Sequence, residues 1–227
     1  MQRLVLVAAV AAMLSACAVT PAVTTISPAP SDLQKPGWQA VVSAEDQDRL
    51  AHLPGIWRSA LEAVPRRYHR LVTREGDLLV AGAARERPAT PPGSYRCRLV
   101  RLGAGAGGEP PVQSFPDFFC YVRAEHDNLL SFTKQTGTDL PGGWIYDDTD
   151  RRLVLAGAKQ RAVGDNSLGY GAEPDRDLVG VIERIGPFRW RLVLPWRGER
   201  PGLDIYELTP VPLEQQAAEP PASPDSP

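Results

Sequence analysis

Apolar and polar residues alternate most clearly in the second half of the chain. Between positions 188 and 194 the even residues are Phe, Trp, Leu and Leu, while positions 189 and 191 are arginine. Strand side chains point alternately to opposite faces, so this run predicts a strand with one buried and one solvated face. The preceding run, 178–185, is apolar on both faces except for one Glu-Arg pair, which is typical of a strand inside a sheet. The Gly-Pro pair between the runs predicts a hairpin.

Further strand candidates arrive at regular spacing, with turn-forming residues between them. No helical period separates them, which predicts an antiparallel meander of about eight strands. The fold class is therefore mainly β, either a calycin-like barrel or a sandwich, with short N-terminal helices. A closed barrel is favoured because it leaves no free edge. The strand candidates are residues 95–102, 118–124, 128–135, 143–146, 152–158, 178–185, 188–194 and 203–208.

Residues 43–64 precede these strands and carry a helical period. Leucine, tryptophan and valine recur there at steps of three and four residues, as on a helix with one buried face. Ser43 followed by Asp46 predicts an N-cap. Pro54 and Pro65 divide the segment into two short helices, with Pro54 tolerated early in the second. We expect their apolar stripe to cover the sheet.

Composition limits the classes of function. The chain has 227 residues, 43% hydrophobic and 23% charged, which is ordinary for a folded protein and excludes disorder of the whole. Its net charge of -2 and pI near 6.0 give no broad positive field, so nucleic acid is not an expected partner. Lysine is scarce beside arginine, which a GC-rich coding bias explains without any phosphate-binding role.

The first residues carry the most specific motif of the chain. Arg3 supplies a positive charge, residues 4–13 form an apolar run too short to span a bilayer, and Leu-Ser-Ala-Cys follows, ending at Cys17. The pattern resembles a bacterial lipoprotein signal peptide, residues 1–16, whose removal leaves Cys17 lipidated and tied to a membrane. Ala18, where inner-membrane lipoproteins carry aspartate, resembles outer-membrane sorting. We therefore expect a lipoprotein of the cell envelope that faces the periplasm.

Three further boundaries follow from composition. Residues 17–37 are rich in Pro, Thr, Ala and Ser without an apolar period, which predicts a flexible tether. Residues 38–212 carry the helix and strand patterns and form the single predicted domain. Residues 213–227 are acidic and rich in proline, and we expect them to be disordered.

Export to the periplasm makes the two other cysteines a pair. Cys97 and Cys120 lie in consecutive strand candidates, and an oxidising space favours joining them. Both are equally far from the centre of the connection 103–114, so a simple antiparallel hairpin places them opposite one another. Such a disulfide contributes about 3 kcal/mol in the chain-entropy model. No Cys-x-x-Cys spacing or nearby histidine supports a redox or metal site.

Several short segments carry a family resemblance by their order along the chain. They are residues 95–98, 134–137, 176–180, 183–186 and 189–195. Together they resemble a proteobacterial family known as domain of unknown function 4893, over about residues 38–210. The family name carries no activity, so the resemblance implies no catalytic residue. Residues 138–140 depart from the more polar turn of that family.

The sequence matches several catalytic and ligand-binding motifs only in part. Ser131 and Lys134 match the Ser-x-x-Lys pattern of penicillin-recognising enzymes, but that pattern needs a helix, and a strand points the two side chains to opposite faces. The glycine-rich run 103–108 lacks the Gly-Lys-Ser/Thr that follows a phosphate-binding loop. The aspartates at 147–150 read as turn residues, since they lack the spacing of a calcium loop. We predict no cofactor and no metal site.

Two groups of side chains are candidates for binding. Aromatic residues could line a barrel mouth that takes an apolar ligand, or they could pack in the core. These are Trp144, Tyr146, Trp190 and Trp196. Two arginine rows could meet an anionic partner or lipid headgroups, or they could form a solvated face paired with acidic residues. These are Arg96, Arg98, Arg189 and Arg191.

The pattern as a whole favours a non-enzymatic lipoprotein whose barrel binds a small ligand or an envelope protein. A first alternative is a periplasmic protease inhibitor, because small disulfide-bonded barrels with mobile N-terminal arms inhibit secreted metalloproteases. Lipidation of Cys17 would, however, block the free N-terminus that such an arm uses. A second alternative is an enzyme whose residues meet only in three dimensions, and then Asp177, Glu183 and Asp204 are the first carboxylates to test.

Overall fold

The computed structural model describes residues 37–103, 108–125, 129–162, 169–198 and 200–215. All of them fall within one unit, Lys35–Pro227. The predicted signal peptide, Cys17 and the predicted tether up to residue 36 lie outside the described residues, as does most of the predicted tail. The first tail residues, Leu213–Gln215, form a 3₁₀ turn, η7.

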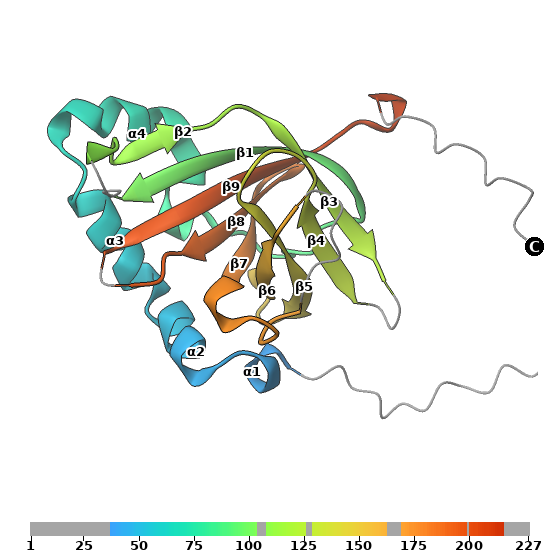
Figure 1. Ribbon diagram of the computed structural model, residues 1–227. Coiled ribbons are helices and arrows are strands. Elements are labelled where there is room, and N and C mark those ends of the chain that lie inside the picture. The colour runs from blue at the N-terminus through green and yellow to red at the C-terminus, as the bar shows by residue number, and fades with distance from the viewer. Residues whose placement is uncertain (1–36, 104–107, 126–128, 163–168, 199, 216–227) are drawn as a thin grey trace, which may run out of the picture. The chain divides into compact units, whose positions relative to one another are not determined.

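Short helices fill the first part of the described chain (Figure 1). The predicted N-cap is confirmed, because the backbone amide of Asp46 donates to Oγ of Ser43 at 3.3 Å. Pro54 lies in the first turn of its helix, where a missing N–H breaks no bond. The elements are α1 (Trp38–Val41), α2 (Ala44–Ala51), α3 (Leu53–Glu62), η1 (Arg66–Tyr68), α4 (His69–Glu75), η2 (Gly76–Leu78), η3 (Ala81–Ala83) and, later in the chain, η6 (Pro174–Arg176).

Nine strands within the described residues form one antiparallel sheet. All eight predicted runs are strands. The sequence does not predict β2, since three residues are too few to show alternation. The strands are β1 (Gly93–Gly103), β2 (Val112–Ser114), β3 (Phe118–Ala124), β4 (Leu130–Lys134), β5 (Leu140–Asp147), β6 (Arg152–Gln160), β7 (Asp177–Gly186), β8 (Arg189–Pro195) and β9 (Gly202–Pro210).

The first and last strands close the sheet into a barrel. β1 pairs with β9 from Tyr95 opposite Pro210 to Gly103 opposite Gly202. The barrel thus runs through β1 and then β3 to β9 in sequence order, and β2 adds a short pairing along β1. The predicted mainly β fold and its antiparallel barrel are confirmed.

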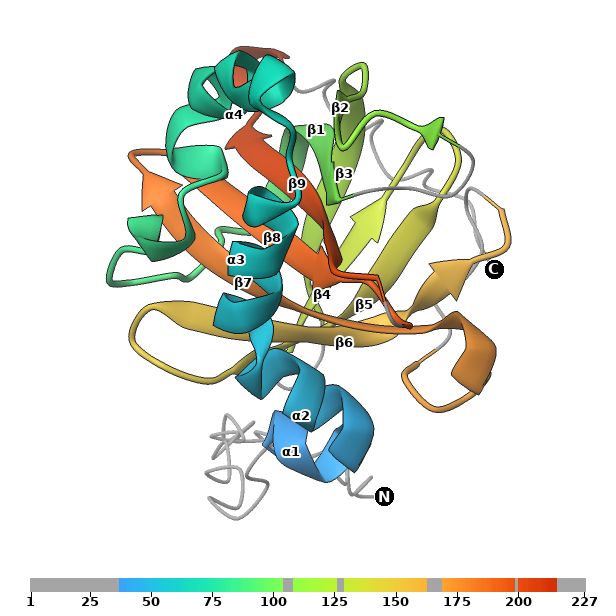
Figure 2. The same cartoon turned by 90° about the vertical axis from the view of Figure 1, so that its left-hand side faces the viewer.

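The barrel has an apolar interior and a second apolar layer on its outer face. Alternate residues of β1 and β3–β9, among them Phe132, Leu155 and Tyr206, pack together inside. The residues between them, such as Val154 and Ile205, pack against buried side chains of α1–α3. α3 lies over β9 and β1, and Figure 2 views the sheet from the side of that helix. The helices therefore cover the sheet as predicted.

A disulfide joins Cys97 and Cys120 inside the barrel, with Cα atoms 6.0 Å apart and no exposed surface. The predicted pairing is confirmed, but the predicted register is wrong. Cys97 lies opposite Phe118 and Cys120 lies opposite Tyr95, so the cysteines are diagonal neighbours on one face. The predicted register would place Gly103 opposite Ser114, whereas β1 pairs with β2 through Val100 opposite Ser114. One extra residue between β2 and β3 then brings Cys97 opposite Phe118.

The β7–β8 hairpin differs from its prediction on both faces. Phe188 is 76% exposed, since it occupies the turn before β8 with a φ of 50°. Arg191, expected on a solvated face, is fully buried. Its guanidinium lies beneath the segment from η2 to η3, to which it donates hydrogen bonds. β7 lies between β6 and β8, as its apolar sequence predicts.

Candidate functional site

One end of the barrel is closed by aromatic side chains. The rings of Tyr95 and Trp190 meet edge-on, with centroids 6.2 Å apart. The phenol of Tyr95 donates to the carbonyl oxygen of Pro91 at 2.5 Å, and the indole of Trp190 donates to that of Pro88 at 3.1 Å. The segment before β1 therefore seals this end.

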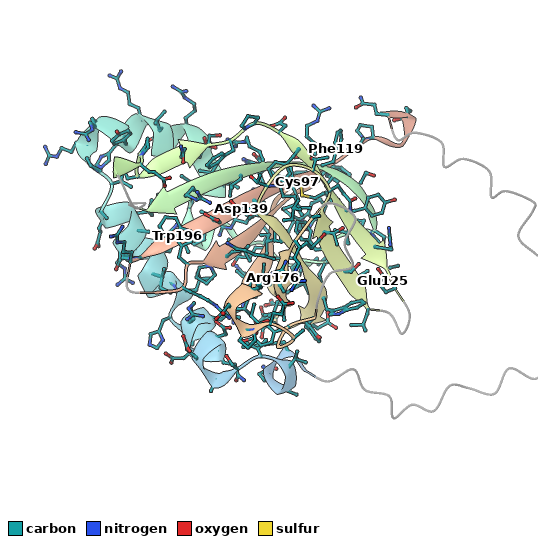
Figure 3. All side chains as sticks on the ribbon, viewed as in Figure 1. Cys97, Phe119, Glu125, Asp139, Arg176 and Trp196 are labelled. Atoms are coloured by element: carbon teal, nitrogen blue, oxygen red, sulfur yellow. A yellow bond between two sulfur atoms is a disulfide. The ribbon has the colours of Figure 1, made fainter. Side chains whose placement is uncertain are left out.

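The opposite end carries charged side chains, and we call it the polar mouth. It lies where β1, β4, β6 and β8 end and where β5, β7 and β9 begin. Figure 3 labels Asp139 and Trp196 at this end and Glu125 toward the other. Alternation along the strands directs seven residues of the polar mouth inward. They are Arg101, Lys134, Asp139, Lys159, Trp196, Asp204 and Tyr206.

Arg101 is the centre of the polar mouth. Its guanidinium binds Asp204 through two hydrogen bonds, Nε to Oδ1 at 2.9 Å and Nη2 to Oδ2 at 3.2 Å. The hydrogen bond with Asp204 raises the pKa of Arg101, so the guanidinium stays charged. It also lies over the rings of Phe115 and Trp196, 5.4 and 5.9 Å from their centroids. These contacts hold the guanidinium of Arg101 in one position.

The indole of Trp196 is held in one orientation. Its Nε1 donates to Oδ1 of Asp204 at 2.9 Å. A Cβ on Gly202 would collide with the ring, and a Cβ on Gly103 would lie 3.2 Å from it. These glycines face each other across β1 and β9. The absence of both side chains lets the indole lie against the backbone.

Lys134 and Tyr206 are buried at the inner side of the polar mouth. Nζ of Lys134 donates to the carbonyl oxygens of Thr138 and, at 3.3 Å, of Asp139, and it lies 4.3 Å from the ring centroid of Phe118. Burial lowers the pKa of Lys134, while nearby carboxylates oppose that shift. Burial raises the pKa of the Tyr206 phenol, and the same carboxylates raise it further. The phenol is therefore neutral and can donate a hydrogen bond.

Two hollows open at the polar mouth. The larger has a volume of about 440 Å³, and the smaller has a volume of about 290 Å³. Arg101 and Asp139 line both and form the wall between them. The larger volume suits one small molecule. Besides residues of the polar mouth, its lining includes Asp46, Arg49, Asp175, Asp177, Leu194 and Arg197.

Asp46 fixes the outer wall of the larger hollow. Its buried carboxylate accepts hydrogen bonds from the hydroxyl of Tyr170 at 2.5 Å and from the guanidinium of Arg197 at 2.6 Å. Arg49, one turn further along α2, also contacts it. Three segments distant in sequence therefore meet around one carboxylate, which gives the hollow a defined wall.

The polar mouth offers both donors and acceptors to a bound molecule. Asp139 is 3.9 Å from Nη2 of Arg101 and 3.9 Å from Nζ of Lys159, beyond hydrogen-bond distance, so its oxygens can accept from a ligand. Asp139 also has a φ of 49°, a left-handed conformation that few residue types adopt. Ion pairs as exposed as that of Asp139 and Lys159, whose side chains are 51% and 61% exposed, contribute only about 0–1 kcal/mol to stability. Stability therefore does not account for these charges.

The four aromatic candidates do not share one mouth. Trp196 lines the larger hollow. Trp144 and Tyr146 alternate with the inward residues of β5 and pack on the outer face. Trp190 closes the opposite end, because β8 spans the barrel between it and Trp196.

The four arginine candidates lie on β1 and β8, on either side of β9. Arg98 and Arg189 both bind Glu207 of β9, with N–O distances of 2.6 and 2.5 Å. Arg191 is buried and cannot contribute to a surface. Arg96 is exposed. These contacts favour the paired, structural alternative for this face.

The three carboxylate candidates also separate. Asp204 and Asp177 line the larger hollow, whereas Glu183 lies on the outer face and binds Arg191 at 2.7 Å. Within the described ranges, no three His, Cys, Asp or Glu side chains gather in a way that could hold a metal ion. In the part of the chain that the structure describes, no helix has the length and apolarity needed to span a bilayer.

Comparison with known families decides the assignment. A family model described as "Domain of unknown function (DUF4893)" matches residues 38–208. The chain belongs to the DUF4893 family. The resemblance carried by the short segments is confirmed, and every residue of the polar mouth falls inside the matched range of this DUF4893 domain. No curated protein and no solved structure matches the chain.

Sequence reasoning missed most of the polar mouth. Arg101, Lys134, Asp139 and Lys159 lie at strand ends or in a turn, where polar residues are ordinary and give no sign that they meet at one end of the barrel. One signal was present in the composition. The chain has three lysines, and two of them, Lys134 and Lys159, lie at the polar mouth.

Proposed function

We propose that this DUF4893 protein is an outer-membrane lipoprotein that faces the periplasm, is anchored through Cys17, and binds a small molecule at the polar mouth without transforming it. The larger hollow carries the ligand-binding part of the proposal. It combines a volume suited to one small molecule with charged groups that stability does not explain. The motif ending at Cys17 carries the anchoring part.

Ligand binding is tested by native mass spectrometry of the full chain purified from the envelope. We expect a discrete small mass on the wild-type protein. Leu194→Trp places a larger side chain in the lining of the hollow and should remove that mass. Leu71→Trp is the matched control, since Leu71 is an exposed leucine on α4, and it should keep the mass. A wild-type protein that carries no small molecule, or only a crosslinked envelope protein, contradicts this part.

Anchoring is tested by fractionation of the cell envelope. Cys17→Ser removes the lipid acceptor, so the protein should leave the membrane fraction. Ala18→Asp keeps the lipid and should move the protein to the inner-membrane fraction. A Cys17→Ser protein that stays with the membranes after a high-salt wash refutes anchoring through this residue.

A further inference from the structure

We infer that the larger hollow takes a neutral saccharide unit, whose ring stacks on Trp196 and whose hydroxyl groups bind the charged residues around it. This inference rests on the proposed function, because it names the ligand class of the same hollow. Three properties of the site support it: a fixed aromatic surface, hydrogen-bonding groups of both kinds, and a charge balance that disfavours anions.

The first property is the preset position of Trp196. The hydrogen bond to Asp204 and the two glycines beneath the ring hold the indole where it lines the hollow. A pyranose ring has an apolar face of C–H groups that packs on such an aromatic surface. Trp196 loses little conformational freedom on binding because the protein already fixes it.

The second property is the mixture of donors and acceptors. The carboxylate of Asp139 lies 3.9 Å from Nη2 of Arg101 and 3.9 Å from Nζ of Lys159, beyond hydrogen-bond distance of both. Asp177 uses Oδ1 to accept from the amide of Gly171 at 2.9 Å, and among the described residues its Oδ2 has no hydrogen-bond partner. A hydroxyl group both donates and accepts, so one polyol can satisfy carboxylates and cations together.

The third property is the charge of the lining. Four cationic side chains and six acidic ones line the larger hollow, so a ligand anion would enter a region of net negative charge. A simple cation would find three of the six carboxylates, those of Asp46, Asp139 and Asp204, already beside guanidinium or ammonium groups. A neutral ligand avoids both penalties.

The test uses the full chain in a detergent that has no sugar headgroup. Cellobiose and N,N′-diacetylchitobiose serve as neutral probes, putrescine as the cationic probe and succinate as the anionic probe. Binding is measured by titration calorimetry and by the indole N–H resonance of Trp196. We expect saturable binding of a neutral disaccharide with a shift of that resonance, and no comparable binding of putrescine or succinate.

Two variants connect this binding to the polar mouth. Trp196→Leu should weaken it by about tenfold or more, whereas Trp144→Leu, on the outer face, should change it by less than about twofold. Asp139→Asn should weaken it several-fold without disturbing the fold, since the Asp139 side chain is 51% exposed and asparagine tolerates its φ. Asp139→Asn keeps the test decisive if Trp196→Leu does not fold.

The outcomes separate the two proposals. Binding of putrescine or succinate without either disaccharide overturns the saccharide inference and leaves a ligand-binding barrel. Disaccharide binding that Trp196→Leu and Asp139→Asn leave unchanged also overturns it. If no probe binds and the purified protein carries no small molecule, both proposals fail.

Discussion

Arg191 is expected to be the most sensitive charged residue of the barrel's outer face. Its side chain has no exposed surface, and its Nε donates to Oε2 of Glu183 at 2.7 Å. It also donates to four backbone carbonyls of residues 77–81 at 2.8–3.1 Å and lies 4.5 Å from the ring centroid of Trp57. Burial lowers the pKa of Arg191, and Glu183 opposes that shift. One guanidinium thus ties the η2–η3 segment and α3 to β7 and β8.

Arg191→Met keeps most of the side-chain volume but removes all of these bonds. Breaking one partner of a buried ion pair costs about 3–5 kcal/mol, and we take this range to include the lost contact with the Trp57 ring. We therefore expect the free energy of unfolding to fall by about 4 kcal/mol. At about 2–4 °C per kcal/mol for a chain of this size, the Tm should fall by roughly 8–16 °C.

The assay is urea unfolding followed by far-UV circular dichroism, with the disulfide kept oxidised. Arg189→Met is the control, because its side chain is 32% exposed and its partner Glu207 retains Arg98, so the cost should stay below about 1 kcal/mol. Adding Glu183→Met to Arg191→Met removes the isolated carboxylate and should recover part of the loss. If Arg191→Met costs no more than Arg189→Met, the reasoning is refuted.

Three further outcomes are expected. Replacing Cys97 and Cys120 together by alanine should lower the free energy of unfolding by about 3 kcal/mol. The wild-type protein, denatured without a reductant, should show no free thiol at either position. A titration that finds two free thiols there would contradict the disulfide. Gly202→Ala should cost about 1–3 kcal/mol by displacing the indole that covers it, whereas Gly55→Ala, with open space around its Cβ, should raise the Tm slightly; equal effects would contradict the close approach. Burial raises the pKa of the Glu207 carboxyl, but hydrogen bonds from Arg98 and Arg189 outweigh burial and lower the pKa below its ordinary value of 4.5. The ionised carboxylate therefore stabilises the folded protein above that pH, and this stabilisation is lost as the pH falls through the pKa of the folded state. Glu207→Gln should therefore flatten acid unfolding below about pH 4.5, and an unchanged acid limb would argue against this pairing.

The barrel could be predicted because each strand leaves its own pattern in the sequence. The inward positions of β8, from Trp190 to Leu194, are apolar, and the cysteines identify two neighbouring strands. The register of those strands could not be predicted, since it depends on where the short strand β2 pairs along β1 and on one additional residue between β2 and β3. Local patterns specify strands, whereas register depends on how connections are built.

The polar mouth was harder to predict for a different reason. Arg101 and Asp204 are far apart in sequence and meet only because β1 pairs with β9. Arg191 follows the pattern of a solvated residue, yet a segment from the helical region covers it. Polar residues show which face of a strand they occupy, but the sequence does not show what lies above that face. Contacts between segments distant in sequence therefore determine both where the residues of the polar mouth meet and why Arg191 is buried.

The pairing of β1 with β9 also sets when the molecule can finish folding. Among the described residues, β1 is the first strand to be synthesised and β9 is the last. The barrel stays an open ribbon until residues 202–210 have emerged, because its final seam joins the two extremes of the domain. Contacts of such long range form slowly. If the chain is exported to the periplasm as we propose, the barrel cannot close until nearly all of the chain has crossed the inner membrane.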